Sequence, residues 1–391
     1  MQDDRAAARW LNHHRAALIA LMLAAVIFGA VRALVAPAPA EAVLTGDYAE
    51  YENGNVTQIL SDTTEPDPTA DGGDRGEQLL LVEITTGQYA GDTLQVYNYA
   101  SPLYGAPLKV GDGCTLIIST YESGNVSATV YEYNRTAPLI IVVGLFLLVT
   151  VLVGGRTGAK SLVGLVFTVA GVFWLLFPAL MKGAPTLPST FALCVYVAAV
   201  SFVILGGVEK KTLCALLGTV AGMAFALIFA LIAQGLLRVD GLRSADVEPL
   251  LQLRQTGTPI GLRGLLAAGV ILSSLGAVMD VAMSLSSALS EVRAADPTLG
   301  SKALFRSGMN IGRDMVGTMT NTLILAFLGS GLVLILYIYS LGLSPHMLLS
   351  SAYLSMEVVS GVSSSIGVIL SVPVTAAICA WAYGDRGKRL G

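Results

Sequence analysis

The residues best suited to chemistry are polar side chains inside a long apolar region, residues 264–331. Asp280 lies deep in its first half, with Ser273, Ser284 and Ser287 at helical spacing. A membrane-spanning helix needs about 20 apolar residues, and a carboxylate at its centre costs at least ~2.5 kcal/mol. Such acids usually face a bundle interior or a water-filled cavity. Asp280 is therefore the leading candidate for a proton- or cation-binding group.

A second polar stripe follows in the same region. Asn310, Asp314, Thr318 and Asn321 recur at helical steps, so one side of a helix carries all four. We expect this stripe and the Asp280 stripe to face each other around a polar pathway. In the alternative interpretation, the hydroxyl and amide groups only join neighbouring helices by hydrogen bonds, which explains a lone carboxylate less well.

Two further charged positions complete the predicted site. Glu357 begins a third stripe on the last apolar segment, in which Pro373 is expected to interrupt the helix. Arg313 and Asp314 are expected at a cytoplasmic helix start, where negative charge is favoured, and would form an inner gate. The predicted substrate- or ion-binding residues are Asp280, Ser284, Asn310, Asp314, Thr318, Asn321 and Glu357, with Arg313 as the gate.

Composition limits the class of protein. Of 391 residues, 54% are hydrophobic and only 13% are charged, which is unlike an ordinary soluble protein. The net charge of −4 gives no basis for nucleic-acid binding, and we expect none. The four cysteines and three histidines have no metal-ligand spacing, so neither a metal site nor a cofactor is expected.

The N-terminal part divides into two predicted regions. In residues 1–40, a short basic segment precedes an apolar run at 16–36, which favours an uncleaved anchor over a cleaved signal peptide. Residues 41–135 hold 15 acids against three bases, and turn signals separate their short apolar runs. About five strands are expected, enough for a small OB-like β-barrel domain inserted after the first helix. The runs lie at 54–60, 79–84, 93–97, 114–118 and 128–131.

Residues 136–391 read as an all-α membrane bundle. With the anchor, about eight transmembrane helices are expected, at roughly 16–36, 137–153, 161–181, 187–207, 212–237, 265–289, 314–339 and 357–383. If both termini are cytoplasmic, 14 of the 23 Lys and Arg residues lie inside, in agreement with the positive-inside rule. The acidic β domain is then extracytoplasmic.

Three motifs together resemble one known family. They are Gly276–Ser284, Ser307–Asp314 and Gly317–Thr322, and the Val153–Arg156 segment fits as well. The chain is similar here to the YibE/F-like family of bacterial multi-pass membrane proteins. The resemblance implies a plasma-membrane protein of the transporter class with no settled substrate.

These observations together predict a secondary transporter or permease rather than an enzyme. It would move a small solute or ion across the bacterial plasma membrane by alternating access around Asp280. Its partners would be the lipid bilayer and that solute, and a homo-oligomer is compatible with the pattern. The alternative is a non-transporting sensor or assembly scaffold whose outer domain binds a partner. An intramembrane aspartyl protease is disfavoured, because Ile311 stands where its Gly-x-Gly-Asp motif requires glycine.

Overall fold

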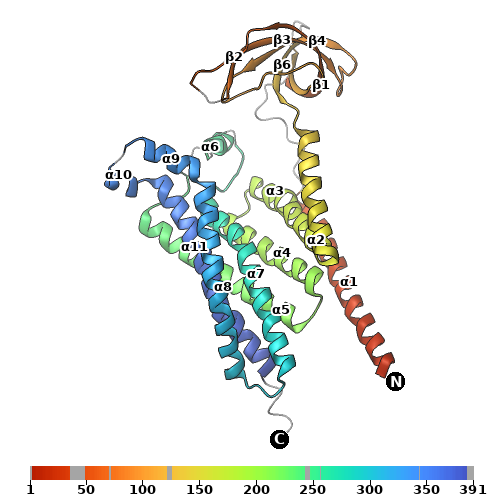
Figure 1. Ribbon diagram of the computed structural model, residues 1–391, viewed down its shortest axis with the longest axis vertical. Helices are drawn as coiled ribbons and strands as arrows, with labels where there is room; N and C mark the ends of the chain where they lie inside the picture. Colours follow the sequence, from red (N-terminus) through yellow and green to blue (C-terminus); the bar gives the residue numbers. More distant parts are fainter. Residues whose placement is uncertain are drawn as a thin grey trace. The chain divides into compact units, whose positions relative to one another are not determined.

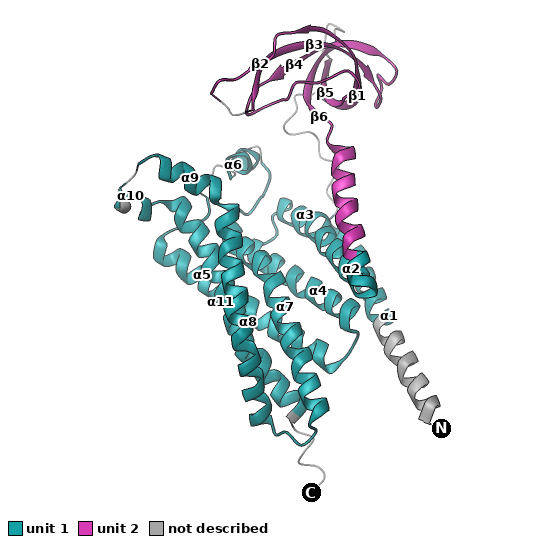
Figure 2. Ribbon diagram, in the orientation of Figure 1, with its two compact units in different colours: residues 1–38, 151–391 teal, residues 39–150 magenta. Residues whose placement is uncertain are grey.

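The computed structural model describes residues 2–35, 49–69, 72–120, 126–242, 247–255, 257–342 and 344–384. The chain divides into two compact units, which Figure 2 colours separately: residues 39–150 form one, and residues 1–38 with 151–391 form the other. All described strands belong to the first unit, and the second is helical (Figure 1).

The first unit contains a closed β-barrel. Its described strands are β1 (Ala49–Asp62), β2 (Glu65–Pro66), β3 (Asp74–Ile84), β4 (Thr93–Ala100), β5 (Gly113–Thr120) and β6 (Val126–Tyr133). They run in the order β1-β5-β6-β4-β3-β2, and β1 also pairs with β3. The five longer strands therefore close on themselves, while the short β2 extends one edge. All of these pairings are antiparallel except that of β4 with β6.

Alternation of inward and outward side chains builds the barrel core. On β3, Leu80, Val82 and Ile84 point inward and are almost fully buried, as are Val96 on β4 and Leu116 on β5. All five strands predicted from the apolar runs are present, so the expectation of a β-barrel is confirmed.

A glycine allows β1 to pair on both sides. Gly54 is opposite both Ile84 on β3 and Cys114 on β5, at the point where β1 passes from one partner strand to the other. A side chain at this position would meet Val82, because its Cβ would lie 2.5 Å from the Val82 Cγ1 atom. The residue without a side chain therefore lets the barrel close.

The polar side chains inside the barrel are hydrogen-bonded. The buried Gln78 amide donates to Asp62 Oδ2 at 2.8 Å, and its oxygen accepts from the Leu108 backbone at 2.8 Å and from Asn98 at 2.9 Å. Hydrogen bonds from Thr64, with a further one from Gln78, hold the pKa of Asp62 below its usual value. These bonds remove the cost of burying two amides.

The second unit is a bundle of long helices. Helix α2 (Thr136–Gly171) begins in the first unit and continues into the second from residue 151. The other described helices belong to the second unit: α1 (Gln2–Val35), the π-helical turn η1 (Val172–Leu176), α3 (Phe177–Met181), α4 (Thr186–Gly206), α5 (Lys210–Leu237), α6 (Glu248–Gln255), α7 (Leu265–Ala295), α8 (Ser301–Ser330), α9 (Leu332–Ser340), α10 (Pro345–Leu349) and α11 (Ala352–Gly384). Helix α11 packs against α5, α7 and α8, and α5 also packs against α7.

Glycines bring α5 and α11 into close contact. A Cβ added to Gly222 on α5 would lie 3.0 Å from the Gly367 carbonyl oxygen on α11, and one on Gly367 would lie 2.9 Å from the Gly222 oxygen. The same crossing places Val278 of α7 and Ser371 of α11 against Gly222. Since lipid supplies no hydrophobic drive for association, such close van der Waals packing is what holds membrane helices together.

The last helices differ from the sequence expectations in their breaks and starting points. The predicted span 314–339 is in fact two helices, because α8 and α9 meet at a break near Gly331 and are bent by 60°. Helix α8 begins at Ser301, so Asp314 lies several turns inside the helix. Pro373 does not end α11, which continues through it to Gly384. The lost backbone bond is tolerated within this packed helix.

The number of spans depends on how α2 is counted. By length and composition, six helices of the described chain can cross a membrane, or seven if α8 and α9 form one span. Residues Thr136–Met181 count as one of these, although 46 residues far exceed the length that a bilayer requires. Gly155 interrupts α2 with φ 55° and ψ −136°, so the segment consists of two helices. The structure thus agrees with a mostly helical membrane bundle and a β-barrel, and leaves eight spans as a prediction.

The close crossing of α5 and α11 predicts a position-specific loss of stability. Gly222→Ala should lower the thermal unfolding midpoint of the detergent-purified protein, because overpacking at a tight contact costs about 1–3 kcal/mol. Gly235→Ala, on the same helix but with open space around it, should leave the midpoint unchanged or raise it. Equal midpoints for the two variants would contradict the proposed packing.

Candidate functional site

Helix α7 has a packed face and a polar face. Ile271, Val278 and Leu285 recur every seven residues and are fully buried. Asp280 is two residues beyond Val278, which places it about half a turn around the helix. Asp280 and Ser284 are both exposed in the isolated chain. The predicted stripe of α7 therefore lies on the side away from the packed core.

Helix α8 is arranged in the same way. Leu304, Gly308 and Gly312 are buried, and a Cβ on Gly312 would collide with Val372 of α11. The predicted site residues are on the other side, where their side chains are exposed. They are Asn310, Arg313, Asp314, Thr318 and Asn321.

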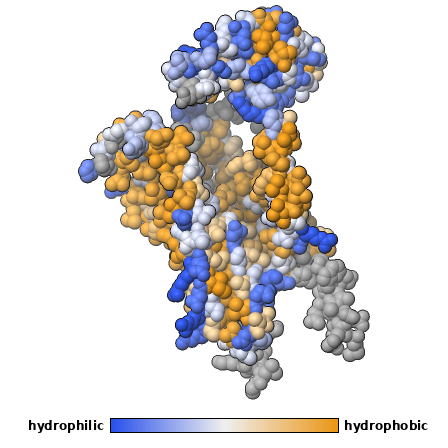
Figure 3. All heavy atoms as spheres, viewed as in Figure 1, coloured by the Kyte–Doolittle hydropathy of each residue, from blue (hydrophilic) through white to orange (hydrophobic). Residues whose placement is uncertain are grey.

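Within the described part of the chain, the two stripes are exposed rather than enclosed by the bundle. The sequence led us to expect that they face each other inside the bundle, but α11 occupies the packed side of both helices. On the face seen in Figure 3, pale and blue side chains lie over α7 and α8 between apolar neighbours. Periodicity located the stripes correctly on each helix, but it did not indicate which side the rest of the chain would cover.

The charged groups of the stripes have no partners in the described part of the chain. The side chains of Asp280, Arg313 and Asp314 form neither a hydrogen bond nor an ion pair with another described residue. The Thr318 hydroxyl is satisfied by its own helix, donating to the Met315 carbonyl at 3.1 Å. Because α8 starts at Ser301, the helix dipole does not reach Asp314, and this basis for the gate is lost.

Glu357 lies apart from the other predicted residues. It is half-buried and lines a cleft of about 170 Å³ between α8, α9 and α11. The remaining lining residues are apolar or glycine, and none belongs to the Asp280 or Asn310–Asn321 stripes. Glu357 therefore does not join those stripes in one site.

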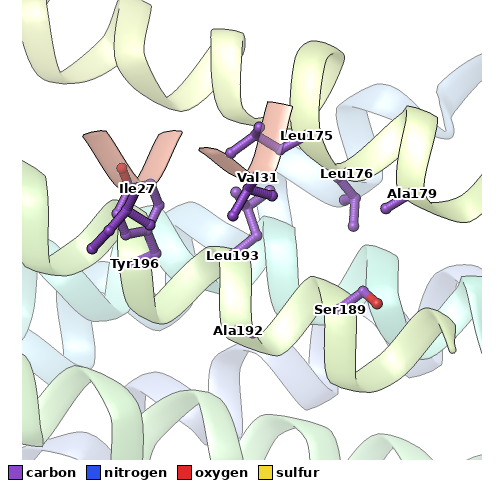
Figure 4. A pocket seen from close by; sticks show the side chains of 9 residues that line it. All are labelled: Ile27, Val31, Leu175, Leu176, Ala179, Ser189, Ala192, Leu193 and Tyr196. Atoms are coloured by element: carbon purple, nitrogen blue, oxygen red, sulfur yellow. The ribbon is translucent and has the colours of Figure 1, made fainter. Parts of the chain in front are cut away.

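A larger cleft lies on the α1 side of the bundle. It has a volume of about 320 Å³, and Figure 4 shows its lining side chains, which come from α1, η1, α3 and α4. Ser189 and Tyr196 are its polar lining residues, and the Tyr196 hydroxyl donates to the Ala24 carbonyl at 2.5 Å. This apolar lining suits an acyl chain better than an ion.

Hydroxyl groups join neighbouring helices of the bundle at several points. The Ser273 and Ser364 hydroxyls lie 3.2 Å apart and join α7 to α11. The Ser286 hydroxyl of α7 donates to the Lys211 carbonyl of α5 at 2.7 Å. The Cys379 sulfur of α11 lies 3.5 Å from the Ser286 hydroxyl oxygen. These contacts agree with the interpretation that hydroxyls join helices, and they show that Ser273, a residue of the predicted α7 stripe, does so.

The described residues contain no cluster of the side chains that most often bind metals. No three His, Cys, Asp or Glu side chains come together in them. All four cysteines are free and buried. In the β-barrel, burial raises the pKa of Cys114 to about 11, with a contribution from nearby Asp112, so its thiol stays protonated near neutral pH.

Several membrane-length apolar helices and two polar helix faces define the chain as a membrane protein. It belongs to the YibE/F-like protein family, whose model matches residues 142–385. This match confirms the resemblance drawn from the motifs around Asp280 and Asn310–Asn321. Comparison with curated proteins and with solved structures found no match.

The two faces of α7 predict different thiol reactivity. In membranes, Ser284→Cys should react with a water-soluble thiol reagent, because it shares the polar face with Asp280. Ser286→Cys should stay unmodified, since this position is packed against α5 and α11. Labelling is measured by mass shift before and after denaturation. Failure of Ser284→Cys to react in the folded protein would contradict access of water to this face.

Proposed function

We propose that the protein is a permease of the bacterial plasma membrane that moves a small cation, or a solute coupled to one, along the polar faces of α7 and α8. The observation that carries the proposal is Asp280: an acid within an apolar helix of membrane-spanning length, outside the packed core and without a partner among the described residues. A structural role would require such a partner, because a lone carboxylate in lipid is costly.

Asp280 would bind the proton or cation in this mechanism. Ser284, one turn further along α7, adds a hydroxyl on the same side, and Thr318 and Asn321 of α8 add uncharged oxygens. Carboxylate and uncharged oxygens together form the ligand set that hard cations prefer. Asn310, Arg313 and Asp314 supply the polar and charged groups at the inner end of the α8 stripe. Protonation or cation binding at Asp280 would remove the cost of the charge and allow the two access states to exchange.

We propose the following arrangement in the membrane. The break at Gly155 would divide residues 136–181 into two spans, and α8 with α9 would form one. With α1, α4, α5, α7 and α11, this gives eight spans and places both termini in the cytoplasm, as the distribution of Lys and Arg favours. The β-barrel would be extracytoplasmic. Its strand order with a parallel β4–β6 pair is typical of OB-like barrels.

The alternative is a sensor or assembly scaffold, and one observation favours it. Tyr51 and Tyr131 contact each other edge-on, Tyr97 and Tyr99 are stacked, and all four rings are exposed on the outer surface of the barrel. Exposed aromatic side chains are common where proteins bind partners. A scaffold would tolerate replacement of Asp280, whereas a permease would not.

Neutralising Asp280 tests the permease. Purified protein is reconstituted in liposomes, and uptake of H⁺, Na⁺, K⁺, Mg²⁺ and Mn²⁺ is measured singly. Each measurement uses an enclosed dye that responds to the ion supplied. Asp280→Asn keeps the shape of the side chain but removes its charge, so we expect flux of the transported ion to fall at least tenfold. Equal folding and insertion of the variants is checked by gel filtration.

Asp296→Asn is the matched control. It also removes one carboxylate from the α7 region, but Asp296 lies just after the helix, where it accepts hydrogen bonds from Thr298. This variant should retain wild-type flux. Wild-type flux from Asp280→Asn would rule out the permease mechanism as proposed.

A further inference from the structure

The outer faces of α7 and α8 are unsuited to lipid. Asp280 alone would cost at least ~2.5 kcal/mol near the centre of a bilayer, and Asn321 and Ser284 add polar groups on the same surface. Hydrocarbon offers no hydrogen bonds in return. A chain that stood alone in lipid would therefore carry a penalty that its own described residues do not relieve.

No segment that the structure describes is suited to cover these faces. The first half of α2, residues 136–153, is a candidate by length, but it is apolar on every side. Its Thr150 hydroxyl already donates to the Phe146 carbonyl at 2.8 Å. A segment of this kind cannot hydrogen-bond to carboxylates and amides.

Glycines on the outer faces indicate contact with another helix. Gly269 and Gly276 of α7 and Gly317 of α8 are on the polar sides, and each has open space where a Cβ would lie. By contrast, Gly222 and Gly312 are at helix crossings, where a side chain would collide with a neighbour. Small residues at membrane helix surfaces allow close approach of a partner helix. The three open glycines have no such partner among the described residues.

The charges on this surface are self-complementary. Arg313 and Asp314 are both on the exposed side of α8, and Asp280 is on the adjoining side of α7. In a two-fold contact, the same surface is used by both subunits, so a basic group of one copy can face an acid of the other. A surface with only acids would repel its own copy.

We propose that a second copy of this chain covers the polar faces of α7 and α8, so that the Asp280 pathway forms between two subunits. This inference rests on the proposed function for the role of Asp280, but the contact itself does not. The site would be incomplete in a single chain, because each copy supplies one wall. Pairing of the faces would exclude lipid from Asp280 and enclose the water that the carboxylate requires.

Cysteine cross-linking in native membranes tests the contact. Gly276→Cys should form a covalent dimer with a short bifunctional thiol reagent, seen on a non-reducing gel as twice the 40.7 kDa chain mass. Gly235→Cys on α5 is the matched control, because it is also a helical glycine with open space around it. It should remain monomeric. The four native cysteines are buried and common to both variants.

A second measurement does not depend on any substitution. Wild-type protein extracted with its lipids into polymer nanodiscs should contain at least two chains when its mass is determined by native mass spectrometry. One chain per disc, or equal cross-linking at Gly276→Cys and Gly235→Cys, would overturn the inference.

The two proposals fail separately. Cross-linking at Gly276→Cys with normal flux from Asp280→Asn would retain the subunit contact and reject the permease mechanism. One chain per disc, together with loss of flux in Asp280→Asn, would retain the permease mechanism and reject the subunit contact.

Discussion

The close crossing of α5 and α11 is the contact on which the helical unit depends. Gly222 and Gly367 remove the side chains that would separate the two backbones, and Val278 of α7 fills the adjoining space. Helix α11 also packs against the apolar sides of α7 and α8. Because α11 covers the apolar sides, the sides of α7 and α8 that carry Asp280 and Asp314 face outward. The position of Asp280 is thus a consequence of packing elsewhere in the bundle.

Buried polar side chains find their hydrogen-bond partners differently in the barrel and in the bundle. In the barrel, Gln78 and Asn98 are buried but bonded to each other and to neighbouring backbone groups. In the bundle, the buried Ser286 donates to the Lys211 carbonyl, and the more exposed Ser273 hydroxyl lies within hydrogen-bond distance of the buried Ser364. The side chains of Asp280, Arg313 and Asp314 have no such partner among the described residues. We infer that their partners are water and a second copy of the chain.

The sequence predicted much of the fold because its signals are local. The β-barrel strands followed from short apolar runs with turn signals, and most long helices followed from apolar length. The breaks were harder to predict. Gly155 and Gly331 end helices, whereas Pro373 does not, since the surrounding packing decides whether a helix can tolerate a missing bond. Likewise, periodicity identified the Asp280 stripe but not its outward position, because in a membrane protein neither apolar nor polar faces mark the interior uniquely.

The most direct test of the account is an electron cryo-microscopy map of the wild-type protein in lipid nanodiscs. The account predicts that the faces of α7 and α8 carrying Asp280 and Asn321 meet the same faces of a second chain, with ordered water between them. A map with one chain per disc and acyl-chain density against Asp280 would contradict it.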